Sequence, residues 1–171
     1  MRKSRKDAAD SRARVLRSAS EIFRAQGYDG VGIAALMQAA GLTNGAFYKQ
    51  FASKEALIAE ATAAALEENL KAWEPVLATG RDPLADWAAW YLAAQDLDRR
   101  DKGCALATLA AEAPRHDDAV RQAFAEGLER MLDRLEAAGA DEPEAIRLLS
   151  RLVGALTLAR AVADPDLSAR I

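Results

Sequence analysis

Apolar residues recur at intervals of three and four along most of this 171-residue chain, and no long stretch alternates apolar with polar residues. Between residues 7 and 26, for example, Val15, Ala19 and Ile22 fall on one side of a helical projection. This period is typical of amphipathic helices packed on a core, whereas half-buried strands need a period of two. We therefore expect an all-α fold.

Capping residues, prolines and glycines mark the helix boundaries. Ser53, Asp82 and Asp141 are suited to N-caps because their side-chain oxygens accept hydrogen bonds from the first helical N–H groups. Pro83 suits a first helical turn, and Gly27 suits a left-handed helix end. The expected helices cover residues 7–26, 33–40, 44–50, 54–77, 83–97, 104–113, 117–138 and 142–163.

The composition excludes several classes of protein. The chain holds 1 Cys and 1 His, which excludes an internal disulfide and a Cys/His metal cluster. We expect no cofactor and no bound metal. No apolar run approaches the roughly 20 residues that a transmembrane helix needs, so we expect a cytoplasmic protein.

An enzyme is the main alternative from another class. No nucleophile, base and orienting group occur together, and Gly27, Gly30 and Gly32 do not form the G-x-G-x-x-G spacing of a dinucleotide site. The charge distribution favours a different activity. Residues 1–55 hold 10 Lys and Arg against 5 Asp and Glu, whereas residues 56–171 hold 13 against 21. A basic head on an acidic body suggests that one end meets a polyanion.

The segment from Gly41 to Glu55, GLTNGAFYKQFASKE, carries the clearest functional pattern. Two short helices joined by a tight turn form the core of a helix-turn-helix, whose second helix lies in the major groove of DNA. Leu42, Phe47 and Phe51 are expected on its buried side. The polar or small residues expected to face base edges are Asn44, Gly45, Ala46, Lys49 and Gln50. The residues expected to contact phosphates are Thr43, Tyr48 and Lys54, with half-buried packing as the alternative for Tyr48.

The segment from Arg14 to Leu57 resembles the DNA-binding domain of the TetR family of bacterial transcriptional regulators. The residues from Ala40 onward match the family pattern A-G-[VL]-[ST]-x-G-x-[LF]-Y-x-x-F-x-[SN]-K-E-x-L at nearly every position. A G-Y pair, Gly27 and Tyr28, precedes it. The resemblance implies a DNA-binding domain over residues 1–53 and an effector-binding and dimerisation domain over residues 54–171.

Two positions depart from that pattern. Gly32 stands where the family usually has a Thr or Ser that caps the second helix and touches phosphate, and Ala34 replaces a residue that is often polar or basic. The DNA contact at this helix should therefore be weaker. A basic arm would compensate by reaching along the backbone or into the minor groove. The residues of this arm are Arg2, Lys3, Arg5 and Lys6.

The last predicted helix is apolar over an arc too wide for one interface, so two surfaces must cover it. One side should pack within the subunit, and the other should form a four-helix bundle with the 117–138 helix across a two-fold axis, as the resemblance also implies. Recognition helices on such an axis lie about 34–36 Å apart and read a palindrome. The residues expected at the interface are Leu128, Leu135, Leu148, Leu149, Leu152, Val153, Leu156 and Ala159. A monomer with a buried central helix is the alternative.

Three tryptophans and a tyrosine lie between residues 73 and 91. The resemblance implies a small-molecule pocket in this region, and we expect an apolar or aromatic effector. The residues expected to line it are Trp73, Trp87, Trp90, Tyr91, Cys104, Phe124 and Met131, with ordinary core packing as the alternative. Cys104 is either a thiol that senses electrophiles or a small buried hydrophobe. His116 is expected at the surface.

Together these features predict a ligand-responsive transcriptional regulator. We expect a repressor that binds a palindromic operator as a homodimer and is released when an effector spreads the recognition helices. The alternative is a helical interaction module of the same fold that has lost DNA binding, which Gly32 and Ala34 make conceivable.

Overall fold

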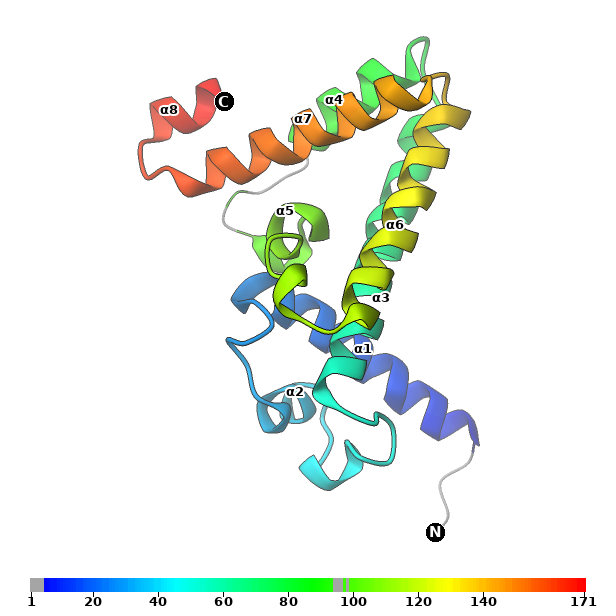
Figure 1. The fold of residues 1–171 in the computed structure, drawn as a ribbon, viewed down its shortest axis with the longest axis vertical. Helices are drawn as coiled ribbons and strands as arrows, with labels where there is room; N and C mark the ends of the chain where they lie inside the picture. Colours follow the sequence, from blue (N-terminus) through cyan, green and yellow to red (C-terminus); the bar gives the residue numbers. More distant parts are fainter. Residues whose placement is uncertain (1–4, 94–96, 98) are drawn as a thin grey trace.

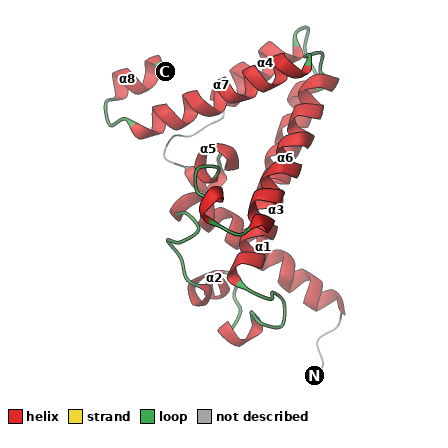
Figure 2. Ribbon diagram, viewed as in Figure 1, coloured by secondary structure: helices red, strands yellow, loops and turns green. Residues whose placement is uncertain are grey.

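The computed structural model describes residues 5–93, 97 and 99–171. The described residues form helices and no strand, which confirms the all-α prediction (Figure 2). None of the described helices is long and apolar enough to cross a membrane. The elements, with η for short 3-10 helices, are α1 (Arg5–Gln26), α2 (Ile33–Ala39), η1 (Asn44–Ala46), α3 (Lys54–Leu77), α4 (Pro83–Ala93), η2 (Arg100–Lys102), α5 (Ala105–Leu109), η3 (Ala113–Arg115), α6 (Asp118–Ala137), α7 (Glu142–Ala161) and α8 (Pro165–Arg170).

The helices are arranged around one long element, α3 (Figure 1). At its N-terminal end, α1, α2 and η1 form a small unit at the bottom of the view. α6 lies along α3, and α4 and α7 run together from the other end. α5 sits between α1 and α7 and contacts both, so the small unit is joined to the body by more than the chain connection.

The predicted caps start the long helices. The Oγ of Ser53 accepts a hydrogen bond of 3.0 Å from the N–H of Ala56 and so starts α3 at Lys54. The Oδ1 of Asp141 accepts one of 2.8 Å from Glu144 at the start of α7. Each bond satisfies one of the N–H groups that a helix leaves unpaired at its first turn. These helix starts are therefore set by local sequence, as predicted.

Several elements differ from the sequence prediction. The helix expected at 44–50 is a 3-10 turn over Asn44–Ala46 followed by turns, with bonds of the i to i+3 type, and Gly45 weakens helix propensity there. The helix expected at 83–97 ends at Ala93 in the described part, since Leu97 lies in a bend and 94–96 fall outside the described residues. The helix expected at 104–113 shrinks to α5, because after Leu109 the chain turns through i to i+3 bonds into η3.

A further difference is α8, which the sequence analysis did not predict. The Oδ1 of Asp164 accepts hydrogen bonds from Asp166 and Leu167, and Pro165 begins the helix. The same Asp-Pro sequence, Asp82 followed by Pro83, stands at the start of α4. The signal for α8 was therefore present in the sequence.

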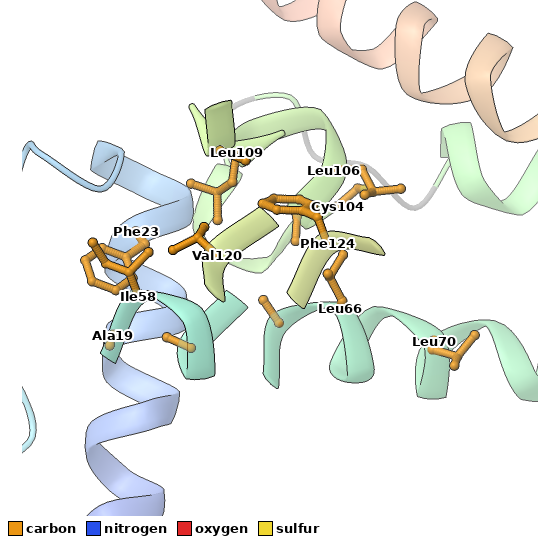
Figure 3. Close-up of a cluster of buried hydrophobic side chains, with 14 of the residues drawn as sticks. Ala19, Phe23, Ile58, Leu66, Leu70, Cys104, Leu106, Leu109, Val120 and Phe124 are labelled. Atoms are coloured by element: carbon orange, nitrogen blue, oxygen red, sulfur yellow. The ribbon is translucent and has the colours of Figure 1, made fainter. Parts of the chain in front are cut away.

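A continuous core connects the small unit with the body. Ala19 and Phe23 of α1 lie beside Ile58 of α3, and Leu109 and Val120 continue the cluster into α5 and α6 (Figure 3). Because these side chains are buried against one another across the expected domain boundary, the two parts share one hydrophobic core.

α3 and α6 come closest at Gly127, in the middle of α6. A Cβ added to Gly127 would lie 2.5 Å from the Cδ1 and 3.1 Å from the Cβ of Leu66, which is itself buried. Such distances leave no room for a side chain without a shift of Leu66 or of the α6 backbone. The pairing of these helices therefore depends on a residue without a side chain at this position.

We expect Gly127→Val to lower the free energy of unfolding by about 1–3 kcal/mol, because overpacking forces α3 and α6 apart. Urea denaturation followed by circular dichroism would measure the loss. Ala125→Val is the matched control, since Ala125 is exposed on the same helix and carries only the lower helix propensity of valine. Equal losses in the two variants would contradict the packing argument.

Candidate nucleic-acid interface

The position of the small N-terminal unit is set where α1 ends. Gly27 has a φ of +79°, and a Cβ added there would lie 2.6 Å from the Oε1 of Glu112. The Oε2 of Glu112 accepts a 2.8 Å hydrogen bond from the N–H of Tyr28. Glycine is therefore required at position 27 both for its backbone conformation and for the approach of Glu112.

Tyr28 is a structural connector. Its ring is buried, and packs edge to face on Phe23 at 5.3 Å and on His116 at 4.9 Å between ring centroids. Its hydroxyl lies 2.7 Å from the Oγ1 of Thr62 on α3. Burial raises the pKa of the Tyr28 phenol, so the group stays neutral and remains available for this hydrogen bond. Tyr28 thus joins the turn after α1 to the body of the protein.

The tight turn between α2 and η1 is built on Gly41. This residue has a φ of +70°, and its N–H donates to the carbonyl of Gln38 at 2.9 Å. The N–H of Leu42 donates to Met37 over the same distance. α2 itself begins at Gly32 with no side-chain cap, in agreement with the departure noted in the sequence.

Beyond the turn, one side of the chain faces the core as predicted. Phe47 and Phe51 are buried and stack on each other with ring centroids 5.7 Å apart. The guanidinium of Arg12 on α1 lies 4.7 Å over the ring of Phe51, and also donates to Glu60 of α3 at 2.7 Å. This packing fixes the orientation of the short segment that follows Gly41.

The other side carries the residues predicted to meet DNA, at the lower end of the molecule in Figure 1. Thr43, Asn44, Gly45 and Lys49 are exposed, and Tyr48 is 71% exposed, so half-buried packing does not describe it. The remaining predicted residues, which are partly buried, are Ala46, Gln50 and Lys54.

Two of the partly buried side chains are engaged within the chain. The Nε2 of Gln50 donates to the carbonyl of Ala46 at 3.4 Å. The Nζ of Lys54 lies 3.8 Å from the Oδ1 of Asp29, in the loop after α1. Both side chains therefore have a partner within the protein in this structure.

The predicted basic arm is shorter than expected. Arg2 and Lys3 lie outside the described residues, whereas Arg5 is already the first residue of α1 and Lys6 follows on the same helix with an exposed side chain. Helix formation two residues earlier than expected places Arg5 and Lys6 on a helix and not in a free arm.

The residues predicted to line an effector pocket are packed together. Trp73 and Trp87 lie 4.6 Å apart and Tyr91 lies 5.6 Å from Trp87, all three buried. Burial, together with the neighbouring Cys104, raises the pKa of the Tyr91 phenol. Cys104 and Phe124 belong to the same core (Figure 3), as does Met131, and Trp90 is partly exposed. The aromatic rings therefore fill the space around Trp73 with one another.

The residues predicted for a dimer interface fall into two groups. Leu135, Leu149, Leu152 and Leu156 are buried within the subunit, which makes them core residues. Those that remain partly accessible are Leu128, Leu148, Val153 and Ala159. α6 packs along α3 and diverges from α7 (Figure 1). Leu158 of α7 is 59% exposed.

Two side chains with polar groups are buried at the contact between the small unit and the body. Arg24 is 2% exposed and donates to the carbonyl of Gly103 and to Glu68. His116, expected at the surface, has a side chain that is 6% exposed, and its Nδ1 lies 3.1 Å from Glu55. Neither partner is close in sequence, so local patterns carried no signal for these contacts.

Comparison with known proteins agrees with this geometry. Residues 15–61 match the family of bacterial regulatory proteins named tetR. No curated protein matches the chain in sequence at a significant level.

Solved structures extend the similarity along the chain. A TetR-family regulator from Cytophaga hutchinsonii has a TM-score of 0.78 and 20% identity, covering 99% of this chain and 92% of that one. NemR from E. coli, in its reduced form, has a TM-score of 0.76 and 22% identity, covering 89% and 88%. A TetR regulator from Chloroflexus aurantiacus has a TM-score of 0.75 and 23% identity, covering 91% and 87%. Residues 15–61 therefore match the N-terminal domain of the TetR family, and the chain shares the all-helical fold of solved TetR-family regulators over nearly its whole length.

Proposed function

We propose that the protein is a ligand-responsive transcriptional repressor, which binds a palindromic operator as a homodimer and is released by a small-molecule effector. The observation that carries this proposal is the exposed surface of η1 and the turns after it, held in place by the buried Phe47 and Phe51. Small side chains let the backbone come close to base edges, and amide side chains can hydrogen-bond to those edges. The buried phenylalanines hold both kinds in a fixed position.

The residues on this surface divide into two roles. Thr43, Tyr48 and Lys54 contact phosphates and so fix the position of the domain on DNA. The residues that read base edges are Asn44, Gly45, Ala46, Lys49 and Gln50. Lys54 exchanges Asp29 for a phosphate oxygen when DNA binds, and Gln50 releases the carbonyl of Ala46.

The domain division proposed here places DNA binding in residues 1–53 and effector binding and dimerisation in residues 54–171. Accessible residues of α7 supply the dimer contact, among them Leu148, Val153, Ala159 and the exposed Leu158, and Leu128 contributes from α6. A subunit contact is needed because one short recognition segment buries little DNA surface, whereas two on a dyad read two half-sites.

The second candidate, a helical module that no longer binds DNA, is favoured by one observation. α2 begins at Gly32 without a side-chain cap, and Ala34 offers no polar group, so this helix supplies little to a phosphate contact. The two candidates differ in their behaviour toward duplex DNA and salt.

Selection of duplexes from a random pool, followed by affinity measurements at several salt concentrations, tests the function. We expect a palindromic consensus and an affinity that falls steeply with salt, because phosphate contacts release counterions. Lys54→Ala should lower the magnitude of the log–log salt slope by about one and weaken all sequences alike. Lys71→Ala, an exposed lysine on α3, is the control and should leave the slope unchanged. Absence of any duplex binding would favour the module without DNA binding.

We expect Gly32→Ser to tighten DNA binding several-fold. The backbone at Gly32, with φ −91° and ψ 161°, suits a serine N-cap, and an added Cβ meets nothing within 4 Å. The hydroxyl can cap α2 and reach a phosphate, whereas Gly32→Ala adds the Cβ alone. Fluorescence anisotropy with the selected duplex would compare the two variants, and equal affinities would argue against a phosphate contact at this helix start.

We expect Leu158→Glu to convert the dimer into a monomer at micromolar concentration, because it places a charge within an apolar contact. Sedimentation velocity would measure the change, with circular dichroism to verify the helix content. Ala72→Glu, on the exposed side of α3, should remain dimeric. A monomeric wild-type protein, or a dimeric Leu158→Glu variant, would contradict the proposed contact.

A further inference from the structure

The only histidine of the chain lies in a polar contact between the segment before α6 and the start of α3. The side chain of His116 is 6% exposed. Its Nδ1 lies 3.1 Å from the Oε1 and 3.3 Å from the Oε2 of Glu55, in the first turn of α3. The N–H of Asp117 donates to the same Oε2 at 3.3 Å. One carboxylate thus ties the segment that leads into α6 to the beginning of α3.

His116 touches both elements that hold Lys54, a residue proposed to contact phosphate. One element is the first turn of α3, where Lys54 directly precedes Glu55. The other is the loop after α1, because the ring of His116 packs on the ring of Tyr28 with centroids 4.9 Å apart. The residue after Tyr28 is Asp29, whose Oδ1 lies 3.8 Å from the Nζ of Lys54. A change in the contacts of His116 therefore acts on the position of Lys54 from two sides.

The titratable and charged groups around the imidazole come from several elements. Glu55 faces it from α3, and Glu112 accepts the N–H of Tyr28, the residue on which the ring packs. Burial raises the pKa of the Tyr28 phenol, and Glu112 and Glu55 add to that rise, so both carboxylates act on this region. The exposed charged side chains on the histidine's own segment are Arg115, Asp117 and Asp118. Of these groups, Glu55 makes the hydrogen-bond contact with the imidazole.

The strength of this contact depends on the charge of the imidazole. A neutral imidazole can donate a hydrogen bond from Nδ1, whereas an imidazolium makes the same bond to a carboxylate with the help of its charge. Charge-assisted bonds are roughly twice as strong as neutral ones. Histidine is the side chain whose ordinary charge change falls between about pH 5 and 8. Since His116 is the only histidine in the chain, an effect of histidine protonation can be assigned to it.

We propose that His116 is a positioning residue for DNA binding. Through Glu55 it holds the first turn of α3, and with it Lys54, in the arrangement that binds DNA, and a proton on the imidazole strengthens this contact. Because the fraction of protein ready to bind limits the apparent affinity, DNA is bound more tightly in mild acid. The effect on DNA rests on the proposed function, whereas the contact rests on the geometry alone.

Nitrogen NMR on the full chain tests the contact without DNA. Because the chain has a single imidazole, its two ring nitrogens give an unambiguous pair of signals in nitrogen-15-labelled protein. We expect a proton on Nδ1 at about pH 8, since the hydrogen bond to Glu55 selects that tautomer. A proton on Nε2 with a bare Nδ1 would overturn the contact and with it the positioning role.

DNA affinity at two pH values tests the positioning role. Fluorescence anisotropy with the selected duplex, at fixed ionic strength, should show binding about fivefold tighter at about pH 6 than at about pH 8. His116→Gln and Glu55→Gln should each lose most of this difference, because one removes the charge and the other removes its partner. Asp118→Asn is the control and should keep the difference, since it removes an exposed carboxylate that is paired with Arg121.

The two variants also separate positioning from other effects of pH. A proton attracted only by the field of DNA would keep the pH dependence in Glu55→Gln. The α-amino group, which also titrates in this range, would keep it in both variants. The side chain of Glu55 is 32% exposed, so its variant should fold even if His116→Gln does not, which circular dichroism would show.

The outcomes distinguish this inference from the proposed function. An affinity of the wild type that is equal at the two pH values, or a pH dependence that is unchanged in Glu55→Gln, would overturn the positioning role and leave the function standing. A protein that binds no duplex at either pH would overturn both, whereas the ring signals would still decide whether the contact forms.

Discussion

The hydrogen bond from the N–H of Tyr28 to the carboxylate of Glu112 determines how the small N-terminal unit sits on the body. A buried N–H without a partner costs free energy, so the turn after α1 is stable only where the body supplies that acceptor. Glu112 in turn occupies the space beside Gly27 that a side chain would need. The hydroxyl of Tyr28 then reaches Thr62, which joins the same turn to α3. One carboxylate thus couples the end of α1 to α3 and η3.

The contacts around this bond make the proposed DNA-binding surface part of a larger rigid structure. Arg24 ties the last turn of α1 to Gly103 and Glu68, and His116 lies beside Glu55 in the first turn of α3. The core is continuous across the same region. A small change in one of these polar contacts therefore acts on the orientation of the whole N-terminal unit.

Local features of this fold could be predicted from the sequence, and long-range ones could not. Ser53 and Asp141 start their helices as expected, because a cap depends on residues three positions apart. The partner of Arg24 lies 79 residues away and that of Tyr28 lies 84 residues away, so nothing near either residue indicated the contact. The effector pocket expected at the aromatic residues stays a prediction for a related reason: aromatic residues close in sequence can line a cavity or fill it, and here Trp73, Trp87 and Tyr91 pack on one another. The exposed residues from Thr43 to Lys49 lie where the motif predicted, whereas their role toward DNA stays a prediction.

The close approach of α3 and α6 at Gly127 has a mechanical consequence. α3 has 24 residues and so extends over about 36 Å. Its first turn adjoins the turns proposed to face DNA, and its last turns lie beside α4. Because α6 packs along α3, the pair resists bending. A tilt at one end of α3 therefore displaces its other end. A rotation of about 5° at one end moves the other by about 3 Å over that length, a displacement comparable to the spacing between successive base pairs.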